Sequence, residues 1–459
     1  MTASLHQDWR QQPIRPERIM ASGFLALILL GGLLLSLPIA SATGKSIGLF
    51  NSFFTATSAV CVTGLVTVDT GTTLSLFGQI VLLLLIQTGG LGFMIFATLV
   101  MVLLGRRISL KNRVMIRESM SAATLSGLIR LSLWYGGMAL CIELAGAALL
   151  SLRFVPLYGW GKGLYYSLFH AVSAFCNAGF DLFGHFSSLT GFIHDPLVVL
   201  TVSMLILLGG LGFSVMFECI HCHHDFRRLS LHAKLVLTVS LGLLVVGTLG
   251  FLLLERSNPA TLGAEGMSFG DKLLNAFFQS VTLRTAGFNT IDLGAMRESS
   301  KLWSVILMFI GASPASTGGG IKTTTFFVVM LSVIATVRQR QDYNYHHRRL
   351  AEGLVKRALA LATLALSLVI MDTVVISAIE YWSGGQENMV DILFEVVSAF
   401  GTVGLSTGIT AGLHDVAKFM LIITMFCGRV GLLTVSMALS GGGNKASAVR
   451  YPEDRMMVG

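Results

Sequence analysis

The segment that decides the fold is Phe53–Asp69, with the sequence FFTATSAVCVTGLVTVD. Its first part is small and apolar, and it is long enough for about three turns of helix. The segment then breaks at Val62-Thr63-Gly64-Leu65 and ends on an acid. It is too short and too polar to cross a bilayer, which takes about 20 apolar residues as a helix. Long apolar runs nevertheless flank it on both sides.

Three related segments follow later in the chain. They are LFHAVSAFCNAGFDLF at 168–183, FFQSVTLRTAGFNTIDL at 277–293 and LFEVVSAFGTVGLSTGIT at 393–410. Each has a short helical lead, a few small or polar residues, a glycine and a large apolar residue. The central glycines are 115, 108 and 117 residues apart, at Gly64, Gly179, Gly287 and Gly404. The chain therefore consists of four copies of one unit.

A second glycine-rich landmark lies 24 to 30 residues after each central glycine. The four copies are QTGGLGFM (87–94), LLGGLGFS (207–214), GASPASTGGGIK (311–322) and CGRVGLLT (427–434). Because the two landmarks recur at similar spacing in all four copies, we expect each unit to be a helix, a re-entrant half-helix, an irregular strand and a second helix. The half-helices are predicted at about 49–60, 165–175, 273–283 and 390–400.

The composition places the chain in a membrane. Hydrophobic residues make up 53% and charged residues only 12%, where about a quarter of the residues of soluble proteins are charged. Uncharged runs of 20 residues or more occur at 19–44, 70–105, 196–217, 235–254 and 302–321. The predicted fold class is an all-α polytopic membrane protein, with eight transmembrane helices and four re-entrant half-helices around a pseudo-fourfold central pore.

The predicted units cover 19–107, 128–220, 232–338 and 352–446, between tails at 1–18 and 447–459. In the first two units the second helices are expected to run unbroken at 76–105 and 194–218. Basic residues gather in the linkers between units, and acids gather in the connectors that hold the repeats. Because cytoplasmic loops are rich in Lys and Arg, we expect both tails in the cytoplasm. The basic linker 106–127 is predicted to form a helix on the membrane surface.

Four irregular strands at membrane depth predict a cation pore. Such backbone is tolerated only where it is buried in protein or lines a water-filled path. Converging strands can present carbonyl oxygens that replace the hydration shell of an ion. Each half-helix entering from outside points a C-terminal end, worth about −0.5 elementary charge, into the membrane interior. The predicted ion-binding residues are Val62, Thr63, Gly64, Asn177, Ala178, Gly179, Thr285, Ala286, Gly287, Thr402, Val403 and Gly404.

Two of these strands, 62–65 (VTGL) and 402–405 (TVGL), resemble the first part of the TVGYG filter of potassium channels. The whole chain resembles the membrane subunit of the bacterial Ktr potassium-uptake systems (KtrB-like), within the Trk/Ktr/HKT superfamily. The resemblance rests on the four strands, on SPASTGGGIK at 313–322, on GRVG at 428–431 and on YPED at 451–454. It implies potassium uptake through a channel-like pore, with K⁺ at the filter as the metal ion and no organic cofactor in this chain.

The same resemblance implies several partners. It predicts a homodimer in the cell inner membrane, surrounded by lipid, with a cytosolic ring of nucleotide-binding regulatory subunits (KtrA-like) docked on it. It also implies Na⁺ as an activator of uptake. No nucleic-acid partner is expected, because the net charge of +8 is explained by the topology of the basic linkers.

Residues 311–320, GASPASTGGG, interrupt an otherwise apolar helix. A lone Gly-Pro pair would be a tolerated kink, but ten consecutive residues exceed one. The resemblance identifies this segment as the intramembrane loop below the filter that opens the pore. The predicted gating residues are Gly311, Ser313, Pro314, Ser316, Thr317, Gly318, Gly319, Gly320, Lys322 and Arg429.

Arg429 is a charge within an apolar helix, which is usually functional. It either pairs with a helix acid such as Glu143 or Asp372, or lies beside the pore near the loop and repels cations. Lys322 is similar but is expected nearer the cytosolic end. For Glu143 and Asp372 themselves, helix–helix hydrogen bonding is favoured over a role as proton-relay acids.

Three alternatives follow from other patterns. Cys219 and Cys222, with His221, His223 and His224, form one CxxC without a second ligand pair, so a histidine-rich loop is favoured over a zinc site. No nucleophile or phosphate-loop motif stands out, so an enzyme is not predicted. A Trk-type transporter or an ion-coupled (H⁺ or Na⁺) cation symporter is the competing function. Carriers commonly show inverted repeats, whereas these four units enter from the same side.

Overall fold

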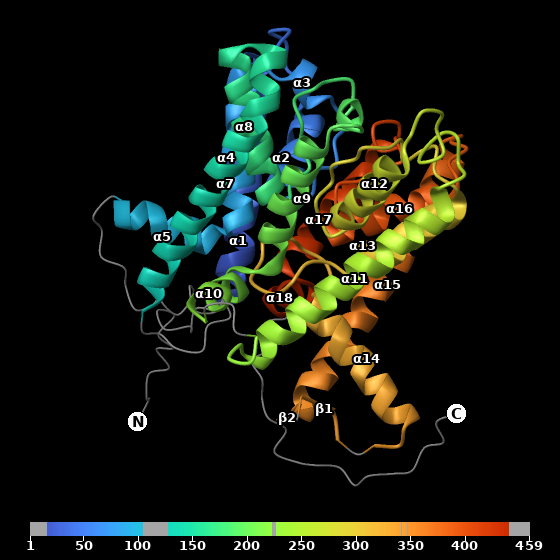
Figure 1. Cartoon of the computed structure of the whole chain (residues 1–459). Coiled ribbons are helices and arrows are strands. Elements are labelled where there is room, and N and C mark those ends of the chain that lie inside the picture. The colour runs from blue at the N-terminus through green and yellow to red at the C-terminus, as the bar shows by residue number, and fades with distance from the viewer. Residues whose placement is uncertain (1–15, 104–126, 223–225, 341, 347, 440–459) are drawn as a thin grey trace, which may run out of the picture.

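The structure is a computed structural model that describes residues 16–103, 127–222, 226–340, 342–346 and 348–439. Almost all regular structure in it is helical, in four groups that follow one another along the chain (Figure 1). The first group contains α1 (Pro16–Ser36), η2 (Pro38–Ala40), α2 (Leu49–Val60), α3 (Thr70–Thr73), α4 (Leu76–Leu91) and α5 (Phe93–Leu103). The second contains α7 (Leu128–Tyr158), α8 (Trp160–Phe175), η3 (Thr190–Phe192), α9 (Pro196–Leu211) and α10 (Phe213–His221).

The third group contains α11 (Leu231–Glu255), α12 (Phe269–Thr282), α13 (Glu298–Phe309) and α14 (Thr323–Val337). A short antiparallel hairpin of β1 (Asn344–Tyr345) and β2 (Arg348–Arg349) connects it to the fourth group. The fourth contains α15 (Glu352–Trp382), α16 (Met389–Gly401), α17 (Asp415–Val430) and α18 (Leu432–Leu439). The hairpin lies at the end of the molecule opposite α3 (Figure 1).

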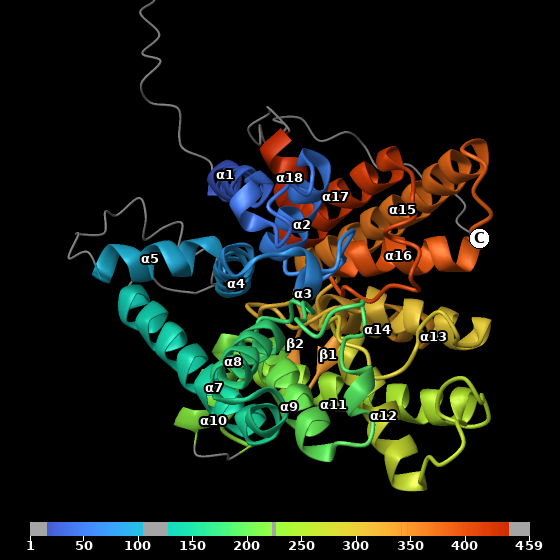
Figure 2. The ribbon, with the colours of Figure 1, turned by 90° about the horizontal axis from the view of Figure 1, so that it is seen from above.

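Seen from above, the four groups surround a common centre (Figure 2). Consecutive groups contact each other through α4 and α8, through α9 and α12, and through α13 and α16. Helix α17 of the last group contacts α2 of the first. The four groups therefore close into a ring.

The short helices α2, α8, α12 and α16 are the predicted half-helices, and they form the buried centre. Three of them lie within four residues of the expected bounds, and α8 begins five residues earlier than expected, at Trp160. The Phe of the repeated FF or LF pair is fully buried in all four, at Phe54, Phe169, Phe278 and Phe394. This recurring aromatic anchors each half-helix in the interior, since a fully buried aromatic supplies much of the packing of a core.

The long helices carry the apolar surface of a multi-pass membrane protein. By length and composition, α1 from Glu17 onward, α7, α11 and α15 can each cross a membrane, and the number of spans rises to seven if each of three bent helix pairs counts as one. Their exposed faces are apolar, as at Leu30, Leu140, Leu241 and Met371, each more than half exposed. The eighth predicted span corresponds to α13 and α14, separated by residues 310–322. The predicted helical, polytopic fold class is confirmed.

The prediction of unbroken second helices is wrong. Helix α4 meets α5 at 108°, α9 meets α10 at 97°, and α17 meets α18 at 99°. Each break falls on one glycine of the second landmark, Gly92, Gly212 or Gly431, with φ between 84° and 95°. Glycine tolerates this conformation because it has no Cβ. These landmark glycines are thus sites where the chain bends sharply, which hydropathy alone did not reveal.

Side-chain caps set several helix starts at the end of the molecule where the half-helices begin. Ser268 and Asp271 form a complete capping box at α12, and Asp195 caps α9 ahead of Pro196. Such caps satisfy backbone N–H groups that have no partner within the helix. The predicted surface helix at 106–127 lies, except for Gly127, outside the described residues. The two predicted tails do so as well, apart from residues 16–18.

Candidate ion pathway

The four central glycines lie against one another in a closed ring. A Cβ placed on Gly179 would lie 2.7 Å from the carbonyl oxygen of Ala286, and one on Gly287 would lie 2.7 Å from that of Val403. Gly404 faces the carbonyl of Thr63, and Gly64 faces that of Ala178, at still closer range. Each glycine therefore meets the carbonyl of the next strand, which only a residue without a side chain permits.

The strands share a second backbone feature that was not predicted. The residue two positions before each glycine has a left-handed backbone, with φ between 51° and 68°, at Val62, Asn177, Thr285 and Thr402. For a residue with a Cβ this conformation costs about 1–3 kcal/mol, and it persists only where the surrounding structure imposes it. Val62 and the two threonines are β-branched, so sequence propensity argues against the conformation that the ring requires.

Hydroxyl side chains of the half-helices anchor these strands. The hydroxyls of Ser58 and Ser398 accept hydrogen bonds from the backbone N–H of Gly64 (3.0 Å) and Gly404 (3.1 Å). Ser173 and Thr282 instead donate to the carbonyls of Phe180 and Phe288. The sequence analysis missed these residues. The signal that would have found them is a Ser or Thr at one place in all four repeats: Ser58, Ser173, Thr282 and Ser398.

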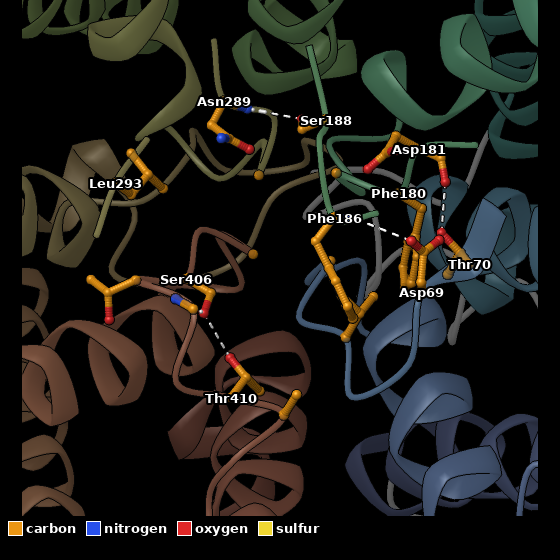
Figure 3. Close-up of a pocket in the computed structure, with 18 of the residues that line it drawn as sticks. Asp69, Thr70, Phe180, Asp181, Phe186, Ser188, Asn289, Leu293, Ser406 and Thr410 are labelled. Atoms are coloured by element: carbon orange, nitrogen blue, oxygen red, sulfur yellow. Dashed lines mark hydrogen bonds between the residues drawn. The ribbon is translucent and has the colours of Figure 1, made fainter. Parts of the chain in front are cut away.

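On one side of the ring lies a cavity of about 260 Å³, here called the vestibule (Figure 3). It is lined by the four glycines and by residues that follow them in each strand. Three carboxylates are among the lining residues, Asp69, Asp181 and Asp292. Asp69 accepts a hydrogen bond from the backbone N–H of Phe186 (3.1 Å), which joins the first and second groups at the rim. The vestibule is thus an acidic approach to the ring.

The pKa of one vestibule carboxyl group, that of Asp181, is shifted. Burial, reinforced by the charge of nearby Asp69, raises the pKa of Asp181 to about 7. The backbone N–H of Phe183 donates to the Asp181 carboxylate (3.1 Å) and opposes this shift. Asp181 is therefore a vestibule acid whose charge changes near neutral pH.

On the other side of the ring lies the loop of residues 310–322. Its backbone N–H groups at Ser313 and Thr317 donate to the carbonyls of Gly210 (3.1 Å) and Gly209 (3.2 Å) at the end of α9. A Cβ on Gly319 would lie 2.8 Å from the Cγ2 of Thr402. The loop therefore packs against residues that precede the ring glycines, whereas the vestibule is lined by residues that follow them.

Two cationic side chains hold this loop. The guanidinium of Arg429 donates to the carbonyl of Thr317 and to the carbonyls of Gly89 and Gly90 in the first group. The Nζ of Lys322 donates to the carbonyl of Gly318 (2.7 Å). All of these acceptors are backbone oxygens. The predicted gating residues Gly311 to Gly320, Lys322 and Arg429 are thus brought together by the fold.

The contacts of Arg429 bear on the two hypotheses for this residue. Glu143 accepts from Gln87 of α4 (3.0 Å), and Asp372 accepts from Thr424 of α17. Both acids therefore make the expected helix–helix hydrogen bonds, and neither pairs with Arg429. The guanidinium lies beside the loop, and its predicted effect on cations stays a prediction.

The histidine-rich segment at the end of α10 adds little to the pathway. Cys219 and Cys222 are free thiols, and the ring of His221 stacks on Phe217 at 3.8 Å. Within the described ranges, no group of three or more His, Cys, Asp or Glu residues is placed to hold a metal ion. His223 and His224 lie outside those ranges.

Comparison with known proteins places this architecture in a family. Residues 19–442 match the model of the TrkH family, which is described as a cation transport protein. The chain belongs to the TrkH family of cation transporters. The match covers all four helical groups and the loop between α13 and α14.

Relatives within the TrkH family are similar over nearly their whole length. The chain is 42% identical over 444 residues to the Ktr system potassium uptake protein B of Bacillus subtilis, covering 97% of both chains. It is 40% identical over 449 residues to the potassium/sodium uptake protein NtpJ of Enterococcus hirae, covering 97% of this chain and 98% of that one. These matches confirm the predicted resemblance to the Trk/Ktr superfamily.

The fold of this TrkH-family chain is also found in a solved structure. The crystal structure of the potassium transporter TrkH from Vibrio parahaemolyticus matches it with a TM-score of 0.70 at 18% identity. The match covers 95% of this chain and 87% of that one. At this identity the match shows a shared fold.

Proposed function

We propose that this TrkH-family chain carries potassium into the cell through the ring of four glycines. The observation that carries the proposal is the closed ring itself, which lies between an acidic vestibule and a loop. The relatives are named as potassium or potassium/sodium uptake proteins. The backbone around the ring offers carbonyl oxygens that can coordinate a dehydrated cation.

The proposed filter consists of residues 62–64, 177–179, 285–287 and 402–404. The carbonyls of Thr63, Ala178, Ala286 and Val403 all meet at the ring. Four such oxygens can replace water around a monovalent cation. The four half-helices end at the ring, and their C-terminal dipoles favour a positive ion there. The copies differ in sequence, so the proposed filter has only approximate fourfold symmetry.

The loop of residues 311–320 is the proposed gate. It lies directly beneath the ring and is held by Arg429 and Lys322. Opening the path requires the loop to move away from Thr285 and Thr402, against which its glycines pack. Breaking the bond between Arg429 and Thr317 would release the loop from the first and fourth groups together.

The arrangement in the membrane belongs to the proposal as well. The vestibule faces outward and the β1–β2 hairpin, with Arg348 and Arg349, faces the cytoplasm, because basic residues gather at that end. The units at 19–107, 128–220, 232–338 and 352–446 lie in the inner membrane, with both tails inside. We further propose a homodimer, a nucleotide-binding regulatory ring on the cytosolic face, and Na⁺ as an activator; a multi-component Ktr system and a potassium/sodium transporter are among the named relatives.

A proton-coupled symporter is the less favoured function. Its best candidate acids, Glu143 and Asp372, are engaged between helices by Gln87 and Thr424, and neither lines the vestibule. Neither of these two acids is therefore placed to pass a proton along the proposed path.

Radiotracer uptake by the purified chain in liposomes tests the proposal. Uptake of Rb⁺ and K⁺ should be rapid, should follow an inside-negative membrane potential, and should exceed Na⁺ uptake. Rb⁺ uptake that follows an imposed proton gradient at zero membrane potential would favour the symporter. Liposomes that take up none of the three ions would refute the function.

A further inference from the structure

One position is equivalent in all four half-helices, and it lies three residues before the anchoring hydroxyl described above. Its residues are Thr55, His170, Gln279 and Glu395. In each group this residue directly follows the fully buried Phe of the repeated pair. The four side chains are buried, at 1% exposure or less. The position therefore faces the interior in every group.

In two groups this side chain holds the strand beyond the ring. The Nε2 of His170 accepts from the backbone N–H of Leu182 (3.3 Å), and the Oε1 of Glu395 accepts from that of Thr407 (3.1 Å). Leu182 and Thr407 both lie three residues after a ring glycine. Equivalent residues thus make equivalent contacts, so this half-helix position serves to place the outer part of each strand.

Glu395 does more than its counterpart. Its carboxylate also accepts from the hydroxyls of Ser406 (2.5 Å) and Thr410 (2.7 Å). Ser406, Thr407 and Thr410 all line the vestibule, where the hydroxyl oxygens of Ser406 and Thr410 lie 2.9 Å apart (Figure 3). No ion pair to Glu395 is formed within the described part of the chain. Burying a carboxylate that has only hydrogen-bond donors as partners carries a desolvation cost, which suggests a functional role.

The charges around the vestibule supply that reason. The first three groups each place an aspartate on its wall, at Asp69, Asp181 and Asp292. The described lining from the fourth group consists of glycine, alanine and hydroxyl residues only. Glu395 lies one layer behind these hydroxyls. Its carboxylate is hydrogen-bonded to these lining hydroxyls, and in a buried site its field is screened less than on an open surface.

We propose that Glu395 is a positioning residue of the outer pore mouth and, in its ionised form, adds the fourth group's negative charge to the three aspartates. Its carboxylate holds the Ser406 and Thr410 hydroxyls at the vestibule wall and supplies the fourth group's charge from behind them. Together these effects raise the local cation concentration above the glycine ring. This inference rests on the proposed ion path and names the residue that sets cation affinity at its entrance.

The test is the Rb⁺ concentration dependence of uptake into liposomes. Glu395→Gln keeps the shape of the side chain and removes its charge. We expect the half-saturating Rb⁺ concentration to rise about fivefold, with the maximal rate changed less than about twofold. Glu395→Asp, which keeps the charge, should recover part of the lost affinity. A purely structural role would lower the maximal rate or the melting temperature and leave the half-saturation unchanged.

Two further variants separate charge from positioning. Glu380 of α15 is also buried and accepts a backbone N–H, that of His414 (2.8 Å), but it does not line the vestibule. Glu380→Gln should therefore leave the half-saturation unchanged. The double variant Ser406→Ala, Thr410→Val keeps the Glu395 side chain and its bond from the Thr407 N–H, and removes its two hydroxyl donors. It should raise the half-saturation less than Glu395→Gln does.

The possible results are distinguishable. Wild-type protein that takes up no Rb⁺ refutes the proposed function, and this inference with it. Wild-type uptake with a folded Glu395→Gln variant of unchanged half-saturation overturns this inference alone. If Glu395→Gln is not recovered as a folded protein, the double variant decides, because an unchanged half-saturation there overturns the positioning role and a raised one supports it.

Discussion

The guanidinium of Arg429 donates to the backbone carbonyl of Thr317, which lies in the loop beneath the glycine ring. The same side chain donates to the carbonyls of Gly89 and Gly90 at the end of α4. One residue of the fourth group therefore fastens the loop of the third group to the first. Arg429 has no carboxylate partner among the described residues, and a buried guanidinium of this kind is costly, so its contacts point to control of the loop rather than to stability.

Replacing this side chain should release the loop. We expect Arg429→Gln to raise Rb⁺ flux into liposomes by about tenfold, which corresponds to about 1.4 kcal/mol lost from the closed state. Lys418→Gln is a matched control on the same helix, since Lys418 is also mostly buried but pairs with Asp415. Its flux should equal that of the wild type. A folded Arg429→Gln protein with wild-type or lower flux would contradict the proposed role.

Shortening the loop should act in the same direction. A variant lacking residues 315–318 should conduct faster than the wild type, because it loses the segment that packs against Thr285 and the Phe175 carbonyl. Ser316→Ala serves as a control of unchanged length, since it removes only the bond from Ser316 to the Ser313 carbonyl (2.6 Å). Unchanged flux in a well-folded deletion variant would rule out gating by this loop.

The glycine ring makes a prediction about two glycines of one strand. Gly404 and Gly408 both have a positive φ, at 89° and 98°. A Cβ on Gly404 would collide with the Thr63 carbonyl, whereas a Cβ on Gly408 would meet nothing within 4 Å. Gly404→Ala should therefore lower Rb⁺ uptake by about a hundredfold or abolish Rb⁺ selectivity over Na⁺.

Gly408→Ala isolates backbone strain from this collision. It should cost about 1 kcal/mol of stability and keep both uptake and selectivity. Equal transport defects in the two variants would show that strain, and not the close approach of the strands, explains the effect.

Asp181 gives the vestibule a pH dependence. Because burial raises its pKa to about 7, lowering the external pH from about 8 to about 6 removes one negative charge, and the half-saturating Rb⁺ concentration should rise. Asp181→Asn should weaken this dependence. A pH profile of the Asp181→Asn variant identical to that of the wild type would exclude this assignment.

The same shift has a consequence for stability. The folded pKa of Asp181 lies above its ordinary value, so folding favours the protonated form. The stability that this group contributes is present below its ordinary pKa and is lost as the pH rises through about 7. Asp181→Asn should therefore melt at a higher temperature than the wild type at about pH 8, and the difference should shrink as the pH falls. A variant that melts at the wild-type temperature at about pH 8 would contradict this sign.

Much of the architecture could be predicted from the sequence because it is written in repeats. The recurring glycines at 64, 179, 287 and 404 fixed the number of units, and the apolar leads placed the half-helices within a few residues. The interruption at residues 311–320 could be predicted because ten small and polar residues cannot continue a membrane helix.

Other features depend on contacts between units and have no local signal. The second helices bend at Gly92, Gly212 and Gly431, where the backbone has a positive φ. The residues on both sides of each bend are as apolar as those of a straight helix, so hydropathy does not reveal the bend. The left-handed backbone at Val62 opposes its own propensity and is imposed by the ring. Glu395 was not predicted as a site residue, because its hydrogen bonds come from Ser406 and Thr410. These two residues lie 11 and 15 positions later in the chain and reach the carboxylate only in the folded structure.

The central claim is that four backbone segments meet on one axis and present oxygens to a monovalent cation. The most direct measurement is the anomalous scattering of Rb⁺ in crystals of the protein. The account predicts a Rb⁺ peak on the axis of the ring, coordinated by the carbonyls of Thr63, Ala178, Ala286 and Val403. Rb⁺ peaks found only elsewhere, with Gly64, Gly179, Gly287 and Gly404 apart or facing lipid, would contradict it.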